Sequence, residues 1–224
     1  SSIIAFKIPK KDFKGFNITA AHSDSPTFKI KANAEITVEK NFVKLNVEKY
    51  GGMLMAPWFD RPLGIAGRVM VKKGTKIEEN LIHIDRDIIM IPNLAIHMNR
   101  EANDGYKYNA QTDTQPIFAE LGSDVTLYDI IAKELGVSKD AILDTDLFLT
   151  NRVKGTVWGA NNEFIAAGRL DDLQCVFAGA ESIIEAKNKN NIAVHCVFDN
   201  EEVGSGTKQG AASTFLKDVL TRVN

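Results

Sequence analysis

The sequence has 224 residues, of which 44% are hydrophobic, and 27 Lys and Arg stand against 29 Asp and Glu. This composition is typical of a folded globular chain and excludes a disordered one. The net charge of −2 is scattered, so the chain has neither a basic field for nucleic acid nor a polybasic segment for a lipid surface. No apolar run reaches the roughly 18 residues of a membrane span, and residues 1–11 lack the apolar core of a secretory signal. We therefore expect a cytoplasmic protein with no nucleic-acid or membrane partner.

The first predicted elements are strands. Residues 16–21 (FNITAA) form a short apolar run, and residues 42–50 (FVKLNVEKY) alternate between apolar and polar side chains as a half-buried strand does. Two glycines then end this second strand.

The middle of the chain has a different texture. Short strand-like pieces, such as residues 65–72 (IAGRVMVK) and 80–84 (NLIHI), alternate with clusters of Gly, Pro and Asn. One helix is predicted at residues 127–135. We expect residues 53–153 to form a β-rich inserted domain.

The last third is regular. Residues 163–167 and 192–198 (IAVHCVF) are predicted strands, and each precedes a helical pattern, from about Asp172 and from about residues 207 to 222. A continuous apolar strand between two amphipathic helices is typical of a parallel strand that is covered on both faces. This pattern predicts βαβα architecture.

The expected fold class is therefore α/β, with helices on both faces of a mixed, largely parallel sheet. Residues 1–52 and 154–224 are expected to form this domain, and the β-rich residues 53–153 interrupt it. His195 lies in mid-strand among apolar neighbours, which indicates a hydrogen-bonded core histidine. Cys175 and Cys196 are too few for a disulfide framework and lie in apolar runs.

Candidate functional residues follow three predicted strands. The first strand leads into His22 and Asp24, the strand at 163–167 into Asp171, and the strand at 192–198 into Glu201 and Glu202. Ligands of open α/β sheets bind beyond the carboxyl ends of the strands, so these side chains are expected to share one crevice.

Several carboxylates and a histidine in one crevice repel one another unless a positive charge lies between them. A divalent metal ion supplies that charge, and imidazole together with carboxylates suits Zn²⁺, Co²⁺ or Mn²⁺. His22 and Asp24 are two residues apart, so on an extended segment the carboxylate can orient the imidazole ring. The simpler alternatives are that Asp171 and Asp172 cap a helix, and that Glu201 and Glu202 form a solvated acidic turn.

Five separated segments resemble, in order and spacing, the M18 family of metallopeptidases, the aspartyl aminopeptidases. They are ITAAHSDSP, YGGMLMAPWFDRPLGIAGRV, IPNLAIHMNR, RLDDL and VFDNEEVGSGTKQGA. The resemblance covers nearly the whole chain. It implies a catalytic α/β domain that holds two divalent ions, usually zinc, and an inserted domain that forms dimers within a tetrahedral dodecamer.

The resemblance also implies roles for the candidate residues. His22 and Glu202 are expected to be metal ligands, Asp171 to bridge both ions, Asp24 to orient the ring of His22, and Glu201 to be the general base. The implied reaction is removal of the N-terminal residue of a peptide, preferably Asp or Glu, by a water that the metal ions activate.

Two further expectations come from the family. His97 in LAIHMNR is expected to reach the active site of a dimer partner and assist substrate binding there, and the peptide bond between Asp171 and Asp172 is expected to be cis. Family members continue beyond the last matching segment and supply another Asp and another His as ligands. We therefore expect the sequence to be a fragment that lacks the C-terminal part, with weak or no metal occupancy and no activity by itself.

Two alternatives remain. One is a related dinuclear aminopeptidase with a neutral or hydrophobic preference, and the other is a scaffold without catalytic function whose acidic strand ends are solvated.

Overall fold

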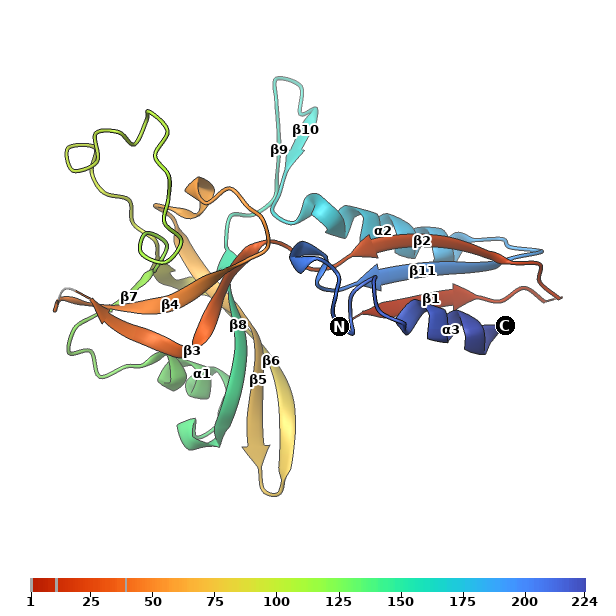
Figure 1. Cartoon of the computed structure of the whole chain (residues 1–224), viewed down its shortest axis with the longest axis horizontal. Coiled ribbons are helices and arrows are strands. Elements are labelled where there is room, and N and C mark those ends of the chain that lie inside the picture. The colour runs from red at the N-terminus through yellow and green to blue at the C-terminus, as the bar shows by residue number, and fades with distance from the viewer. Residues whose placement is uncertain (1, 11, 39) are drawn as a thin grey trace. The chain divides into compact units, whose positions relative to one another are not determined.

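The computed structural model describes residues 2–10, 12–38 and 40–224 (Figure 1). The chain divides into two compact units. The barrel unit is Thr27–Val153, and the split unit combines the residues up to Pro26 with Lys154–Asn224. The first division therefore falls after Pro26, whereas the sequence placed the start of the insert at residue 53.

The split unit contains a sheet with the strand order β1-β11-β2. These strands are β1 (Ile3–Lys7), β2 (Phe16–His22) and β11 (Ile192–Phe198). β11 pairs with β2 in parallel and with β1 in antiparallel orientation. Phe198 lies opposite His22 in the register, so β11 and β2 end at the same edge of the sheet. This edge carries the candidate site.

Alternate side chains of β11 form the core of the split unit. Ile192, Val194, Cys196 and Phe198 are buried, and partly buried side chains of α3 (Phe215–Val223) pack against them. This burial is what the continuous apolar run of β11 predicts.

His195 belongs to the other set of side chains on β11. It is 4% exposed, and its Nδ1 lies 2.9 Å from the hydroxyl oxygen of Thr19, as expected of a core histidine. The helix α2 (Leu170–Glu185) passes over this ring at Gly179, where a Cβ atom would overlap the imidazole. A glycine is therefore what permits this close approach.

Two predicted elements of the split unit differ in the structure. The strand predicted at 163–167 is β10 (Phe164–Ala166), which pairs only with β9 (Thr156–Trp158) among the described residues and forms a separate hairpin. The helix predicted from residue 207 begins at Phe215, because residues 207–214 form turns.

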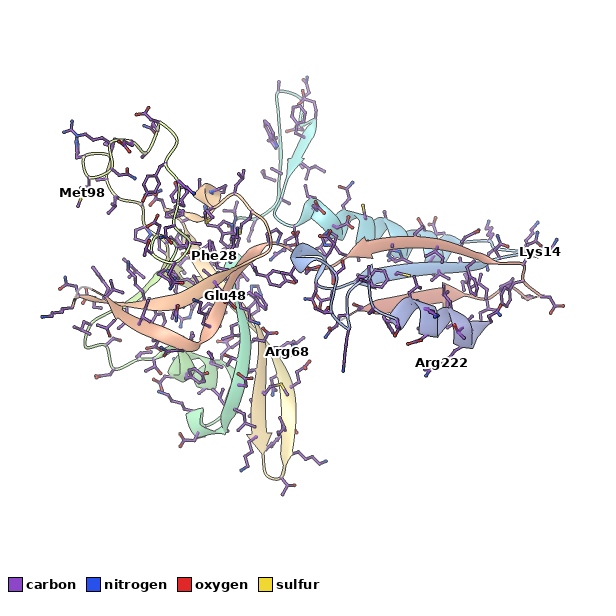
Figure 2. All side chains as sticks on the ribbon, viewed as in Figure 1. Lys14, Phe28, Glu48, Arg68, Met98 and Arg222 are labelled. Atoms are coloured by element: carbon purple, nitrogen blue, oxygen red, sulfur yellow. The ribbon has the colours of Figure 1, made fainter. Side chains whose placement is uncertain are left out.

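The barrel unit is a closed barrel with the strand order β3-β4-β7-β6-β5-β8. Its strands are β3 (Thr27–Val38), β4 (Phe42–Tyr50), β5 (Pro62–Lys73), β6 (Lys76–Met90), β7 (Ile117–Glu120) and β8 (Ile142–Asn151). Apolar side chains fill its core, among them Phe28, which Figure 2 labels, and Leu45, Leu63 and Leu147, all fully buried. Buried apolar side chains are expected on the face of each strand that lines the inside of a barrel.

The helix predicted at 127–135 is confirmed as α1 (Leu127–Leu135). Thr126 and Asp129 form a capping box at its start, and Gly136 ends it in a left-handed conformation. Three short 3-10 helices complete the described elements: η1 (Ala56–Trp58), η2 (Lys139–Ala141) and η3 (Glu201–Val203). No helix in the described ranges is both long and apolar enough to cross a membrane.

The predicted fold class is wrong. Strands account for 40% of the residues and helices for 19%, and the largest sheet is the closed six-stranded barrel, not a largely parallel sheet with helices on both faces. The physical reason is long-range pairing. β3 and β4 pair with each other and with barrel strands, and β10 pairs with β9, which leaves the other sheet with three strands and one parallel pairing.

Candidate metal centre

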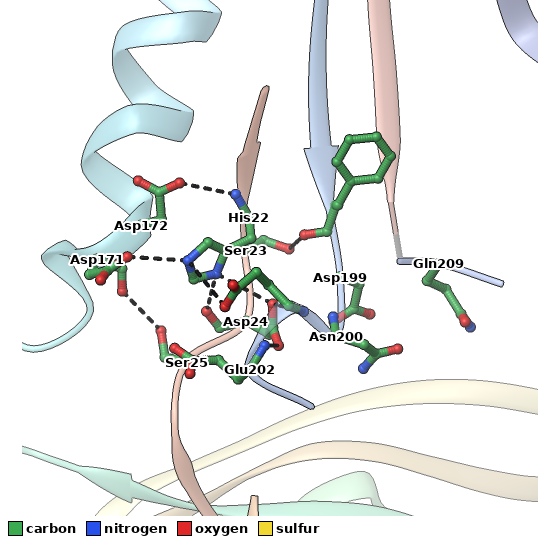
Figure 3. A network of polar contacts seen from close by, with 12 residues as sticks. His22, Ser23, Asp24, Ser25, Asp171, Asp172, Asp199, Asn200, Glu202 and Gln209 are labelled. Carbon is green, nitrogen blue, oxygen red and sulfur yellow. Dashed lines mark hydrogen bonds and ion pairs between the residues drawn. The ribbon is translucent and has the colours of Figure 1, made fainter. Parts of the chain in front are cut away.

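The candidate residues of the split unit come from three segments that meet at the edge of the sheet. His22 ends β2, Glu201 and Glu202 begin the turn that follows β11, and Asp171 and Asp172 lie at the start of α2. Figure 3 shows His22 between Asp171 on one side and Asp24 on the other. The expected convergence of these segments is therefore present in the structure.

His22 is the centre of this cluster. Its Nδ1 lies 3.0 Å from the backbone carbonyl oxygen of Asp24 and 3.4 Å from the carboxylate Oδ1 of that residue. Its Nε2 lies 3.1 Å from Oδ1 of Asp171 and 3.9 Å from Oε2 of Glu201. The side chain is 14% exposed, so bulk water screens these contacts only in part.

The contacts of His22 determine where a positive charge is needed. A carbonyl oxygen only accepts hydrogen bonds, so Nδ1 donates to Asp24 and the neutral ring directs the lone pair of Nε2 at Asp171. Two acceptors 3.1 Å apart repel one another unless a proton or a cation lies between them. Burial lowers the pKa of His22, but the hydrogen bond to Asp24 and the charges of Asp24 and Glu201 outweigh it and raise the pKa above its ordinary value.

The turn after β11 places Glu201 and Glu202 in different surroundings. Asn200 has a left-handed conformation with φ 62° and ψ 27°, and Gly204 has φ 95°, so the chain reverses within a few residues. The side chain of Glu201 is 53% exposed. Burial, together with the negative charge of Glu201, raises the pKa of Glu202 above its ordinary value.

Asp171 and Asp172 interrupt the first turn of α2. Their peptide bond is cis, as the family resemblance led us to expect, and both have non-helical torsion angles. The carboxylate of Asp171 is 89% exposed and directed at His22. The carboxylate of Asp172 accepts a hydrogen bond from the backbone N–H of His22 at 3.1 Å.

The donor set fits a divalent cation. Two overlapping groups each have ligand atoms within 4.8 Å of one another: His22 with Glu201 and Glu202, and His22 with Asp171 and Asp172. Imidazole and carboxylate donors suit Zn²⁺, Co²⁺ and Mn²⁺. A cation among them would relieve the repulsion between Nε2 of His22 and the carboxylate of Asp171.

Sequence reasoning missed the contacts of two residues. Asp172 was considered only as a helix cap, although the N-cap position of α2 is Arg169. Cys175 was expected among apolar neighbours, but it is exposed, and its hydrogen bond to Asp172 lowers the pKa of that carboxyl. Asp172 and Cys175 are three residues apart, and side chains at this spacing on a helix lie close together, so the sequence could have indicated their contact.

His97 belongs to the barrel unit. It is exposed, in a segment of turns that follows β6. The start of this segment is anchored by Asp60, whose two carboxylate oxygens accept hydrogen bonds from the backbone N–H and the side-chain amide of Asn93, both at 2.8 Å. The expected contact of His97 with a partner's active site stays a prediction.

Comparisons with known proteins identify relatives of this chain. The family model described as "Aminopeptidase I zinc metalloprotease (M18)" matches residues 1–224. The "Probable M18 family aminopeptidase 2" of Clostridium acetobutylicum is 48% identical over 231 residues, which are 100% of this chain and 53% of that protein.

Two solved structures have the same fold. Chaetomium thermophilum mApe1 matches with a TM-score of 0.89 and 32% identity over 100% of this chain and 55% of its own. A chain of the S. cerevisiae mApe1 dodecamer matches with a TM-score of 0.82 and 29% identity over 99% of this chain and 52% of its own.

The class of protein that the matching family model describes is the zinc metalloproteases. The chain belongs to the M18 peptidase family, as its sequence segments indicated. It spans about half the length of the curated relatives that it matches.

Proposed function

We propose that this chain contributes the metal centre of a metal-dependent aminopeptidase, which removes the N-terminal residue of peptides. One observation carries the proposal: the imidazole Nε2 of His22 and the carboxylate of Asp171, from distant parts of the sequence, face each other at 3.1 Å with Glu201 close by. Family membership supports the reaction class.

The residues that would hold two divalent ions are His22, Asp171 and Glu202, and Asp171 would serve both ions. Zinc is the metal that the family description names, and cobalt or manganese would suit the same donors. When bound, such ions polarise a peptide carbonyl and lower the pKa of a water molecule. The family resemblance assigns the orientation of His22 to Asp24, a role that either its backbone carbonyl or its carboxylate can fill.

Glu201 is the proposed general base. Its carboxylate is half exposed and lies 3.9 Å from Nε2 of His22, so it can face a substrate without leaving the ligand cluster. It accepts the proton of the attacking water and returns it to the leaving amine. Glu202 suits the ligand role better because its carboxylate is more buried.

We extend the proposal to substrates with an N-terminal Asp or Glu, and to an assembly in which His97 of one subunit assists binding in the next. The matching mApe1 structure is a dodecamer, which supports assembly through copies of the chain. We infer that these copies form dimers, which in turn form the dodecamer. In this proposal the split unit is catalytic and the barrel unit forms dimers. The cytoplasmic location stays a prediction from the sequence.

Metal analysis and hydrolysis assays on the full gene product test the proposal. Wild-type protein, His22→Ala and Glu201→Gln are compared after zinc loading and desalting, with His83→Ala as a control because His83 is an exposed histidine of the barrel unit. His22→Ala is expected to lose zinc. Glu201→Gln is expected to keep zinc and lose about 10²–10⁴-fold in kcat, the usual effect of a general base.

Two results would overturn the proposal: wild-type zinc and turnover in both variants, or no stoichiometric metal in the wild-type protein, which would favour a scaffold. A panel of aminoacyl chromogenic substrates decides the preference. Faster release of Asp and Glu than of Leu supports the acidic preference, and the reverse order supports the neutral alternative.

A further inference from the structure

The carboxylate of Asp24 faces the backbone of the turn that carries Glu201 and Glu202. Its Oδ1 accepts a hydrogen bond from the N–H of Glu201, and its Oδ2 accepts one from the N–H of Glu202, both at 3.1 Å. The side chain is 8% exposed. Each carboxylate oxygen therefore binds one of two consecutive amide groups, away from bulk water.

The conformation of the turn produces this arrangement. Asn200 is left-handed and the next residues form a 3-10 turn, so consecutive N–H groups point to the same side and form a concave site for a negative charge. Hydrogen bonds from backbone N–H groups to a carboxylate are charge-assisted and stronger than those between neutral groups.

The ring of His22 does not need this carboxylate. Its Nδ1 is closer to the backbone carbonyl oxygen of Asp24, at 3.0 Å, than to the carboxylate Oδ1, at 3.4 Å. The carbonyl can only accept, so it is sufficient to place the proton on Nδ1 and leave Nε2 for a cation. Any residue at position 24 supplies a carbonyl oxygen, whereas only an acidic one supplies two strong acceptors for the turn.

We propose that Asp24 is a positioning residue for Glu201 and Glu202, which fixes their backbone through two hydrogen bonds, while the ring of His22 is oriented by the backbone carbonyl of residue 24. The role of these two hydrogen bonds in catalysis rests on the proposed function, in which Glu201 is the general base and Glu202 is a metal ligand. The hydrogen bonds themselves are tested without metal or substrate.

The test is nuclear magnetic resonance of the isotope-labelled full chain as wild type, Asp24→Asn and Asp24→Ala, with Asp218→Asn as the control. Asp218 lies in α3 of the same unit, and its carboxylate accepts the hydroxyl of Thr214. Two signals are followed: the tautomer of His22, from its ring nitrogen shifts, and the hydrogen exchange of the Glu201 and Glu202 amides relative to Val194 in the core strand.

A graded result is expected. Asp24→Ala should speed the exchange of both amides roughly 10- to 100-fold, which is the loss of a hydrogen bond to a charged group. Asp24→Asn keeps one acceptor oxygen, so one of the two amides should remain protected. The His22 ring should keep its proton on Nδ1 in both variants, and Asp218→Asn should change neither signal.

The opposite pattern overturns the proposal: a changed His22 tautomer with unchanged Glu201 and Glu202 amides would show that the carboxylate orients the ring. If the variants do not fold, the wild type still decides, since couplings across the hydrogen bonds from both amide nitrogens to the Asp24 carboxyl carbon are expected, and their absence refutes the proposal. A full gene product that binds no stoichiometric metal, together with the graded result, would refute the proposed function alone.

Discussion

The carboxylate of Asp172 accepts a hydrogen bond from the backbone N–H of His22 at 3.1 Å, although 150 positions separate the two residues in the sequence. The thiol of Cys175, three residues later, lowers the pKa of the same carboxyl. Asp172 thus connects the end of β2 with the start of α2, at the point where the proposed ligands His22 and Asp171 meet.

This connection predicts the effect of Asp172→Ala. Without the carboxylate, the backbone of His22 loses its partner, and the ring is held less firmly against Asp171. Zinc affinity should fall about 10- to 100-fold, the usual effect of removing a group that orients a metal ligand. Isothermal titration with zinc measures the change, and Asp218→Ala should bind like the wild type. Unchanged affinity in Asp172→Ala would contradict this prediction.

The helix cap of α1 predicts a dependence of stability on pH. Hydrogen bonds from Thr126 and Lys139 lower the pKa of Asp129 from 3.8 to about 2. The folded protein therefore holds the ionised carboxyl more firmly than the unfolded chain does. The stabilisation is present above the unfolded pKa and is lost as the pH falls through about 2.

Thermal unfolding of the wild type and Asp129→Asn between pH 2 and 6 measures the stabilisation by Asp129, with about one pH unit between measurements. The melting temperature of the variant should be lower by a constant amount above about pH 4, and the difference should shrink toward pH 2. Asp104→Asn, in an exposed turn, is the control. A difference that does not change with pH would refute the assignment to Asp129.

The close approach of α2 to β11 predicts that replacing Gly179 with alanine destabilises the protein. Alanine normally stabilises a helix interior by about 1 kcal/mol relative to glycine. At Gly179, however, the added Cβ overlaps the ring of His195. Gly179→Ala should therefore destabilise the protein by about 1–3 kcal/mol, as overpacking does.

Urea unfolding measures the change at Gly179, and Gly15→Ala is the control because no atom lies within 4 Å of a Cβ at that position. If Gly179→Ala stabilised the protein, α2 would have to lie farther from β11 than the structure places it.

Gln115 predicts a stability effect in the barrel unit. This residue is 4% exposed, its Oε1 accepts the backbone N–H of Val47 at 2.8 Å, and its amide donates to the carbonyl of Val47 at 3.3 Å. At Val47 of β4, the Gln115 side chain thus makes the hydrogen bonds that the backbone of a neighbouring strand would otherwise make. Gln115→Ala leaves buried backbone groups unpaired and should cost about 1–3 kcal/mol for each.

Hydrogen exchange at the Val47 amide and urea unfolding test this expectation. Gln111→Ala, which removes an exposed contact with Lys31, should have little effect. Equal stability of Gln115→Ala and the wild type would show that water replaces the lost hydrogen bonds.

Local signals predicted the elements whose causes are local. The limits of α1 follow from the capping box at Thr126 and the left-handed Gly136, and β11 follows from its continuous apolar run. The convergence of His22 and Glu201 could be predicted because the parallel strands β2 and β11 end at one edge. Asp171 reaches the same place from the start of α2, although β10, the strand expected to lead into it, lies outside this sheet.

Elements that depend on distant partners were predicted less well. The sequence of β10 suits a strand in either sheet, and only its pairing with β9 decides between them. β3 and β4 join the barrel through β7 and β8, which lie about 70 to 120 residues later in the sequence. The contact of Asp172 with His22 depends on the same long-range folding, so a helix cap was the simpler local interpretation.

The parallel pairing of β2 with β11 has a consequence for synthesis on the ribosome. β2 is translated before the barrel unit and β11 after it, so His22 emerges long before Asp171, Glu201 and Glu202. A nascent chain that ends within Thr27–Val153 can complete barrel hairpins but has no carboxylates from α2 or the β11 turn to surround the imidazole. If these residues hold the proposed metal ions, metal binding is expected only in chains whose translation has passed the barrel unit.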